Sequence, residues 1–89
     1  MFWSIEFEDS ASRDLARLDR VIQHRVFGKI EWLGEHFDEV KIPQLQADWH
    51  GFFKLRIGPW RVAYTFSEQK KLITIWHINN RDKIYKRKK

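Results

Sequence analysis

The chain has 89 residues, 43% of them hydrophobic, with a net charge of +5 and no cysteine, and we expect a single domain over residues 1–89. The lack of cysteine excludes disulfides, thiolate metal sites and a cysteine nucleophile. The sequence shows neither a signal peptide nor an apolar run of membrane-spanning length, so we expect a cytoplasmic protein that has no membrane partner.

The N-terminal half predicts a strand followed by two helices. Residues 2–8 alternate polar and apolar side chains, as in a strand with one buried face. Asp9 or Ser10 is suited to cap the next helix. Apolar residues then recur every three or four positions as far as residue 37, which predicts one amphipathic stripe. A continuous helix of about 40 Å is too long for so small a domain, so we expect a break near residues 18–20, with Asp19 capping a second helix.

The C-terminal half predicts three strands, after a connection over residues 38–51 that includes a short strand around Leu45. Strand-like runs flank Gly58-Pro59, and if these two residues form the turn, Arg56 lies opposite Arg61. After a turn over residues 67–71, residues 72–78 are apolar on both faces, as in a central strand. The predicted fold class is therefore α+β: an N-terminal strand, a helical hairpin, then an antiparallel β-meander, with the helices packed on one face of the sheet.

The other face of this sheet is predicted to carry Lys54, Arg56 and Arg61. Like charges directly opposite each other destabilise an antiparallel pair. Such cations either form a solvated face or bind an anion. Residues 1–48 carry six Lys/Arg against ten Asp/Glu, whereas residues 49–89 carry eleven against two. This asymmetry favours a polyanion, or an acidic protein segment in its place, as partner of the second half.

No spacing of His, Cys or carboxylates predicts a metal site, and we expect neither metal nor cofactor. His77 is more typical of a histidine at the edge of a core than of a catalytic one. A cluster of Lys, Arg and Tyr nevertheless suffices for RNA cleavage, because RNA supplies its own nucleophile, the 2′-hydroxyl. The enzyme has only to align that group, move protons and stabilise charge on phosphorus.

The segments KLRIGPWRVAY (residues 54–64) and RDKIY (residues 81–85), with the helical segment before them, resemble the RelE/ParE superfamily of type II toxin–antitoxin toxins. The likeness extends over nearly the whole chain. For members similar to RelE it implies metal-independent cleavage of mRNA on the ribosome, from the concave face of the sheet. It also implies an acidic RelB-like antitoxin that winds around the toxin, and operator DNA bound only by the toxin–antitoxin complex.

By position, the resemblance assigns Lys54 as a catalytic lysine and Arg61 as the arginine that holds the scissile phosphate. Arg81 matches a second active-site arginine, and Tyr85 matches a tyrosine that stacks on or protonates the substrate. Five further residues are predicted to contact the substrate: Arg56, Phe52, His77, Lys83 and Lys86. Phe52 stands where RelE has another lysine, proposed as base. The alternatives are that Lys54 or His77 takes that role or that the activity is weak, and Phe52 is itself suited to stack on a base.

Two other functions remain open. The ParE branch shares the fold but poisons DNA gyrase by protein contact, and its members generally lack the full basic and tyrosine set. Retention of Lys54, Arg61, Arg81 and Tyr85 together favours the nuclease. A basic RNA-binding module without chemistry would need only stacking aromatics and a basic groove.

Overall fold

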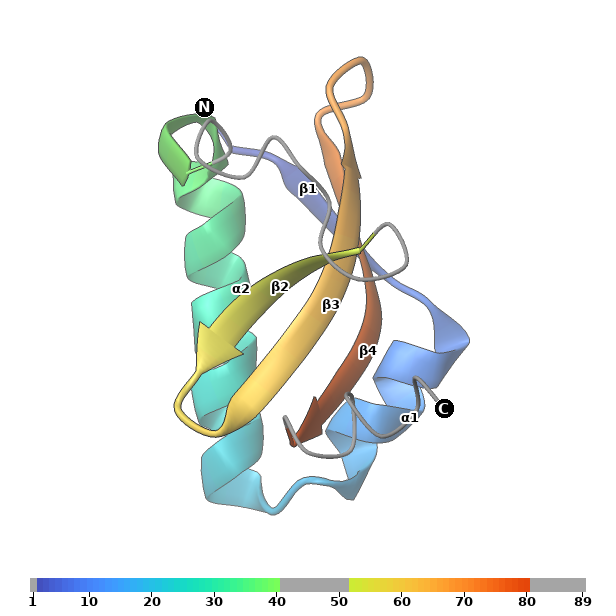
Figure 1. Cartoon of the computed structure of the whole chain (residues 1–89), viewed down its shortest axis with the longest axis vertical. Coiled ribbons are helices and arrows are strands. Elements are labelled where there is room, and N and C mark those ends of the chain that lie inside the picture. The colour runs from blue at the N-terminus through green and yellow to red at the C-terminus, as the bar shows by residue number, and fades with distance from the viewer. Residues whose placement is uncertain (1, 41–51, 81–89) are drawn as a thin grey trace.

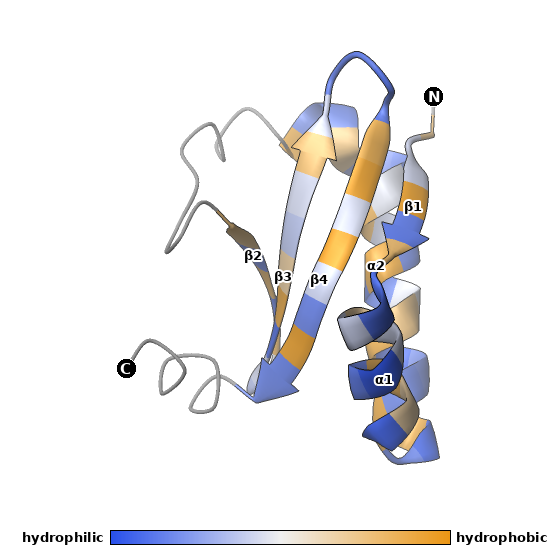
Figure 2. Cartoon of the chain, turned by 90° about the vertical axis from the view of Figure 1, so that its right-hand side faces the viewer, coloured by the Kyte–Doolittle hydropathy of each residue, from blue (hydrophilic) through white to orange (hydrophobic). Residues whose placement is uncertain are grey.

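The computed structural model describes residues 2–40 and 52–80, in which a helical hairpin packs on one face of a four-stranded sheet (Figures 1 and 2). In chain order the elements are β1 (Ser4–Phe7), α1 (Asp9–Arg17), α2 (Arg20–Val40), β2 (Phe53–Ile57), β3 (Trp60–Ser67) and β4 (Leu72–Asn80). The predicted α+β class and the placement of both helices on one face are confirmed. The short strand expected around Leu45 lies outside the described residues.

The sheet has the strand order β1-β4-β3-β2. The last three strands form the predicted antiparallel meander, and the N-terminal strand joins it in parallel, with Ser4 beside Leu72 and Phe7 beside Ile75. The sheet is therefore mixed. Because β1 is only four residues long, it covers the first half of β4 and leaves the second half of that edge to another element.

The helical hairpin breaks where the sequence predicts. α1 ends at Arg17, α2 begins at Arg20, and the backbone N–H of Ile22 donates to Oδ1 of Asp19 at 3.1 Å, so Asp19 caps the second helix. The predicted cap of the first helix is wrong. Its N-cap is Glu8, which makes no side-chain capping bond. The hydroxyl of Ser10 instead donates to the carbonyl of Trp76 at 2.6 Å, because α1 lies against the edge of β4 that β1 leaves uncovered.

The β2–β3 hairpin has the predicted register. Ile57 pairs with Trp60 and Arg56 pairs with Arg61 around a two-residue turn. Gly58 has a φ of +57°, the positive value that the first central position of a primed hairpin turn requires. A residue with a Cβ would be strained there.

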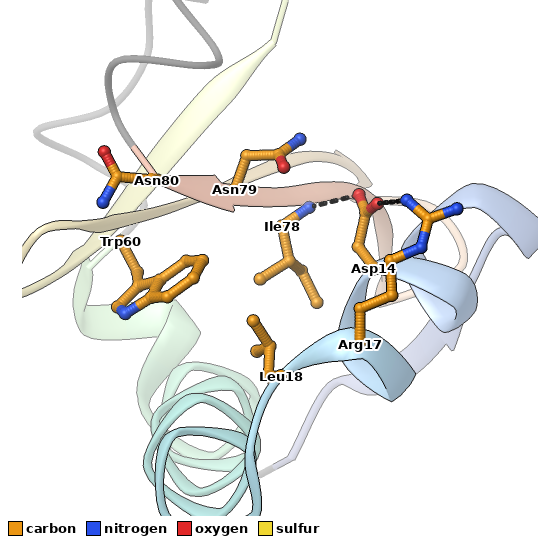
Figure 3. Close-up of a pocket in the computed structure, with 7 residues that line it drawn as sticks. All are labelled: Asp14, Arg17, Leu18, Trp60, Ile78, Asn79 and Asn80. Carbon is orange, nitrogen blue, oxygen red and sulfur yellow. Dashed lines mark hydrogen bonds and ion pairs between the residues drawn. The ribbon is translucent and has the colours of Figure 1, made fainter.

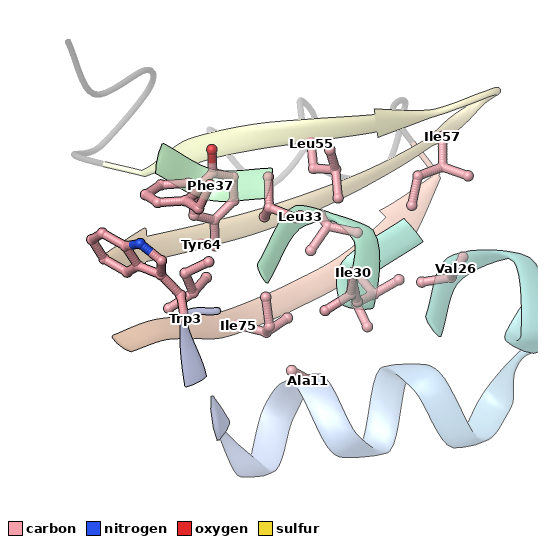
Figure 4. Packing of buried hydrophobic residues seen from close by; sticks show 13 residues of the cluster. Trp3, Ala11, Val26, Ile30, Leu33, Phe37, Leu55, Ile57, Tyr64 and Ile75 are labelled. Atoms are coloured by element: carbon pink, nitrogen blue, oxygen red, sulfur yellow. The ribbon is translucent and has the colours of Figure 1, made fainter. Parts of the chain in front are cut away.

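The core lies between the helices and the sheet (Figure 4). Trp3 closes one end of the core, at the left of Figure 4: its indole packs edge-on against Phe37 at 4.7 Å between ring centroids, and its Nε1 donates to Asp38 at 2.9 Å. The backbone N–H of Trp3 also donates to the carbonyl of Gly34 at 2.9 Å. This brings the chain before β1 against α2 so closely that a Cβ on Gly34 would lie 3.1 Å from the carbonyl oxygen of Trp3.

Candidate functional site

The face of the sheet opposite the helices carries the predicted basic residues of β2 and β3. On the core side Leu55, Ile57, Val62 and Tyr64 are buried, so the intervening residues of both strands belong to the helix-free face. There, two rows run across three strands. One row joins Lys54, Ala63 and His77, and the other joins Arg56, Arg61 and Asn79.

A β-bulge in β4 decides which of its residues join this face. Ala63 pairs with His77 but the next residue, Tyr64, pairs with Ile75, so Trp76 is one extra residue in β4. Uninterrupted alternation would place His77 with the buried Ile73 and Ile75. The bulge turns His77 to the helix-free face and puts Ile78, which is 1% exposed, into the core. The bulge is a feature that residue patterns alone do not reveal.

Arg56 and Arg61 have very different surroundings. Arg56 is exposed, whereas Arg61 is only 7% exposed. The Nη1 of Arg61 donates to two carbonyls at the hairpin turn, those of Gly58 at 2.9 Å and Trp60 at 3.0 Å. Its Nε is buried and has no hydrogen-bond partner among residues 2–40 and 52–80. An unsatisfied buried donor costs about 1–3 kcal/mol, and such a group in a native structure is explained by strain, by a catalytic role or by a bound water or ion.

An aromatic group lies beside Lys54 on the same face. The ring of Phe52 approaches Trp76 at 5.8 Å and His77 at 6.2 Å between centroids. Trp76 is held in place because its Nε1 donates to the hydroxyl of Thr65 at 2.9 Å. Trp76 is absent from the residues predicted from the sequence, where it reads as part of a buried apolar strand.

α1 covers the free half of the β4 edge with polar side chains. Oδ2 of Asp14, a residue 7% exposed, accepts the backbone N–H of Ile78 at 3.0 Å. The same carboxylate lies 4.0 Å from Nδ1 of His77 and 3.9 Å from Nη1 of Arg17. Asp14 therefore connects the end of the helix, the strand edge and the imidazole on the helix-free face.

A cavity of about 170 Å³ opens beside this carboxylate at the end of β4 (Figure 3). The indole of Trp60 and the side chains of Leu18 and Ile78 form its apolar wall, and Asp14 and Arg17 lie on its other side. It borders the helical hairpin rather than the row of Lys54 and His77, and none of the predicted site residues within the described ranges lines it.

The structure thus brings together five of the predicted residues on one face: Phe52, Lys54, Arg56, Arg61 and His77. The other four, Arg81, Lys83, Tyr85 and Lys86, lie outside the described residues. Within residues 2–40 and 52–80, no three His, Asp or Glu side chains are grouped so that they could hold a metal ion. In these same ranges, no helix is both long and apolar enough to cross a bilayer.

Residues 5–85 match the family described as the ParE toxin of the type II toxin–antitoxin system parDE. The match covers most of the chain, which therefore belongs to this family. The protein is a toxin of a type II toxin–antitoxin system, within the RelE/ParE superfamily. A search of curated proteins found no match.

Solved structures share the fold at low sequence identity. The RelBE2 toxin–antitoxin complex from Mycobacterium tuberculosis superposes with a TM-score of 0.68 at 18% identity, over 90% of this chain and 92% of the other. The RelBE complex of E. coli gives 0.67 at 14% identity, over 88% and 95%. The RelE–RelB complex from Pyrococcus horikoshii OT3 gives 0.69 at 17% identity, over 91% and 97%. These likenesses extend to the fold alone.

Proposed function

We propose that this toxin is a metal-independent endoribonuclease that cleaves mRNA on the ribosome in the cytoplasm and so stops translation. The observation that carries the proposal is the arrangement of Lys54, Arg56 and Arg61 on the helix-free face, in two adjacent rows that continue to His77 and Asn79. A solvated face would not require a guanidinium buried with an unpartnered Nε.

In this proposal the arginines act on the phosphate. The 2′-oxygen attacks phosphorus, the P–O5′ bond breaks, and the products are a 2′,3′-cyclic phosphate and a 5′-hydroxyl. Negative charge grows on the non-bridging oxygens during this step, and guanidinium groups are suited to it because their N–H groups pair with two oxygens at once. The turn carbonyls hold the guanidinium of Arg61 in place before the substrate binds. Binding of the phosphate therefore costs little conformational entropy of this side chain.

Lys54 and His77 are the candidates for proton transfer. They lie at the two ends of one cross-strand row with the small side chain of Ala63 between them. Two steps of about 5 Å separate their Cβ atoms by roughly 10 Å, which leaves room for a phosphodiester. One group then takes the proton of the 2′-hydroxyl while the other protonates the leaving 5′-oxygen. Arg81 and Tyr85 are proposed as a second phosphate ligand and a stacking or acidic group, with Lys83 and Lys86 contacting the RNA backbone.

The proposed partner is an acidic RelB-like antitoxin whose segment lies over the helix-free face. Solved structures with this fold include complexes of a RelE toxin with a RelB antitoxin, which supports a partner of this kind. Covering Lys54, Arg56 and Arg61 neutralises the basic face and blocks substrate in one step. Binding of operator DNA is proposed only for the complex.

A second candidate function is inhibition of DNA gyrase by protein contact. Two observations favour it: the matching family is the ParE toxin family, and Phe52 stands where a catalytic lysine is expected. In this alternative the basic face docks on the target or on the antitoxin and performs no chemistry.

Pulse labelling after induction of the toxin alone tests the two functions. A ribonuclease first lowers incorporation of labelled amino acids, and purified toxin with ribosomes and mRNA yields cleaved mRNA in the presence of a chelator. The Arg61→Ala and Arg81→Ala variants should each lose about 10²-fold or more in cleavage rate. If labelled thymidine incorporation falls first and gyrase is trapped on cleaved DNA, the ribonuclease proposal is wrong.

A further inference from the structure

The indole of Trp76 is fixed on the helix-free face by two features of the fold. The bulge makes Trp76 the extra residue of β4, so its side chain shares a face with His77 instead of alternating with it. The bond from its Nε1 to the hydroxyl of Thr65, 2.9 Å long, then sets the orientation of the ring. Since its N–H donor is already used, the group that Trp76 offers to a ligand is its aromatic surface.

The ring of Phe52 lies beside this indole on the same face of the sheet. Its ring lies 5.8 Å from Trp76 with an angle of 63° between the planes, so the two rings form a corner. Both side chains are half-buried. The other large aromatic group, which includes Trp3, Phe37 and Tyr64, belongs to the core on the opposite face. The face of an antiparallel sheet that does not pack on the core is normally polar. Two aromatic rings on that face are therefore more typical of a binding site than of a solvated surface.

The charges around the corner indicate what kind of occupant fits. Lys54 is two residues along from Phe52, on the same face, and Arg56 follows two residues later. Cations beside half-buried aromatic rings match single-stranded nucleic acid, whose bases stack on aromatic side chains while its phosphates contact Lys and Arg. An apolar protein segment would have no use for the neighbouring cations.

We propose that Trp76 and Phe52 form a subsite that stacks one unpaired base of the RNA whose backbone lies along Lys54 and Arg56. This rests on the proposed function for the identity of the substrate, but it concerns binding and not the cleavage step. Stacking tolerates every base and is stronger for the larger ring system of a purine, so the subsite sets a purine preference at one position next to the scissile phosphate.

The test measures binding of RNA that cannot be cleaved. Short single-stranded oligonucleotides with 2′-O-methyl riboses are titrated at low salt against the full chain, followed by fluorescence anisotropy. Each base is replaced in turn by an abasic site. We expect one position at which the abasic substitution weakens binding of the wild-type protein about tenfold, with a purine there binding more tightly than a pyrimidine.

Variants then assign this penalty to the corner. Trp76→Leu should bind the intact RNA about tenfold more weakly, and an abasic site should not weaken its binding further. Trp76→Phe should keep most of the affinity for intact RNA and most of the abasic penalty. Phe52→Leu gives a second test if Trp76→Leu fails to fold, as judged by circular dichroism. The matched control is Trp32→Leu, which removes an indole that is 37% exposed on α2, on the other side of the molecule; it should bind RNA like the wild type.

The outcomes separate this inference from the proposed function. An abasic penalty that depends on Trp76, in a protein that never cleaves RNA, supports the subsite and overturns the nuclease. Cleavage by a protein whose Trp76→Leu variant binds every oligonucleotide like the wild type keeps the nuclease and overturns the subsite. If the wild type binds no RNA, or if Trp76→Leu weakens only antitoxin binding, the corner is not a base-binding subsite.

Discussion

Arg56 lies directly opposite Arg61 in the antiparallel pair of β2 and β3, one residue pair away from the turn. The two guanidinium groups are in unlike environments, since Arg56 is exposed and Arg61 is 7% exposed and donates to the turn carbonyls. The carbonyl oxygens attract the guanidinium of Arg61 and partly offset the repulsion by Arg56. We therefore expect this pair of arginines to lower the stability of the toxin while it supports RNA binding.

Replacing Arg56 by Thr should raise the free energy of unfolding by a few tenths of a kcal/mol up to about 1 kcal/mol. The substitution removes a like-charge cross-strand pair and introduces a residue with high strand propensity. RNA binding should weaken at the same time, because a phosphate contact is lost. Urea denaturation and RNA titration measure the two effects. Lys70→Thr is the control, as Lys70 is an exposed cation in the β3–β4 turn; a similar stability gain there would refute the role of the pair.

Arg61→Lys should impair cleavage nearly as much as Arg61→Ala, by about 10²-fold, because an ammonium group lacks the planar fork that donates to the turn and to phosphate oxygens together. RNA binding should weaken less than cleavage, since other cations still contact the phosphates. Single-turnover kinetics measure the cleavage rate, and filter binding measures the affinity for RNA. Equal losses in both measurements would mean that Arg61 only docks the RNA.

Asp14→Ala should destabilise the fold by about 1–3 kcal/mol, because the backbone N–H of Ile78 is then buried without its acceptor. Asp14→Asn keeps an acceptor oxygen and should cost less. Thermal or urea unfolding measures the difference, and Glu35→Ala on the exposed face of α2 serves as control. An equal cost for the Ala and Asn variants would show that the charge, and not the bond to the strand edge, is what matters.

The two helical glycines of α2 should respond in opposite directions to alanine. Gly28 has open space around the position of a Cβ, so Gly28→Ala should stabilise the protein by about 0.5–1 kcal/mol. At Gly34 the new Cβ would lie 3.1 Å from both the carbonyl oxygen of Trp3 and Cδ1 of Ile5, and overpacking should cost about 1–3 kcal/mol. Unfolding curves of both variants test this, and stabilisation by Gly34→Ala would contradict the close approach of β1 to α2.

Charge reversal on the helix-free face should slow association with the antitoxin. Lys54→Glu with Arg56→Glu should lower the association rate and flatten its dependence on salt, because electrostatic steering acts mainly on the rate of encounter. Reversal of Lys70 and Lys71, in the β3–β4 turn, is the control for net charge. Stopped-flow mixing at several salt concentrations gives both quantities. An antitoxin that blocks the toxin while contacting only α1 and α2 would contradict the proposed covering of this face.

Residue patterns predicted local structure well where a local rule applies. The hairpin around Gly58 follows from a turn that needs a residue without a Cβ, and its register follows from the length of that turn. The helix break at Asp19 follows from the limit that domain size sets on helix length and from the side-chain oxygen available to cap the second helix. The prediction of the α1 cap is wrong because the hydroxyl of Ser10 donates to the carbonyl of Trp76, 66 residues away along the chain. No local rule anticipates such a bond.

Residue patterns alone were enough to predict the α+β class, the strands and helices, and a concentration of positive charge in the second half, because periodicity, turn chemistry and charge are properties of short segments. The contacts between side chains of different elements became visible only in the folded chain. The bulge at Trp76 turns His77 to the face of Lys54, and the uncovered edge of β4 brings Asp14 of α1 to it. Such pairings depend on how strands align across the sheet and on which edges stay unpaired, and both follow from burying the whole core at once.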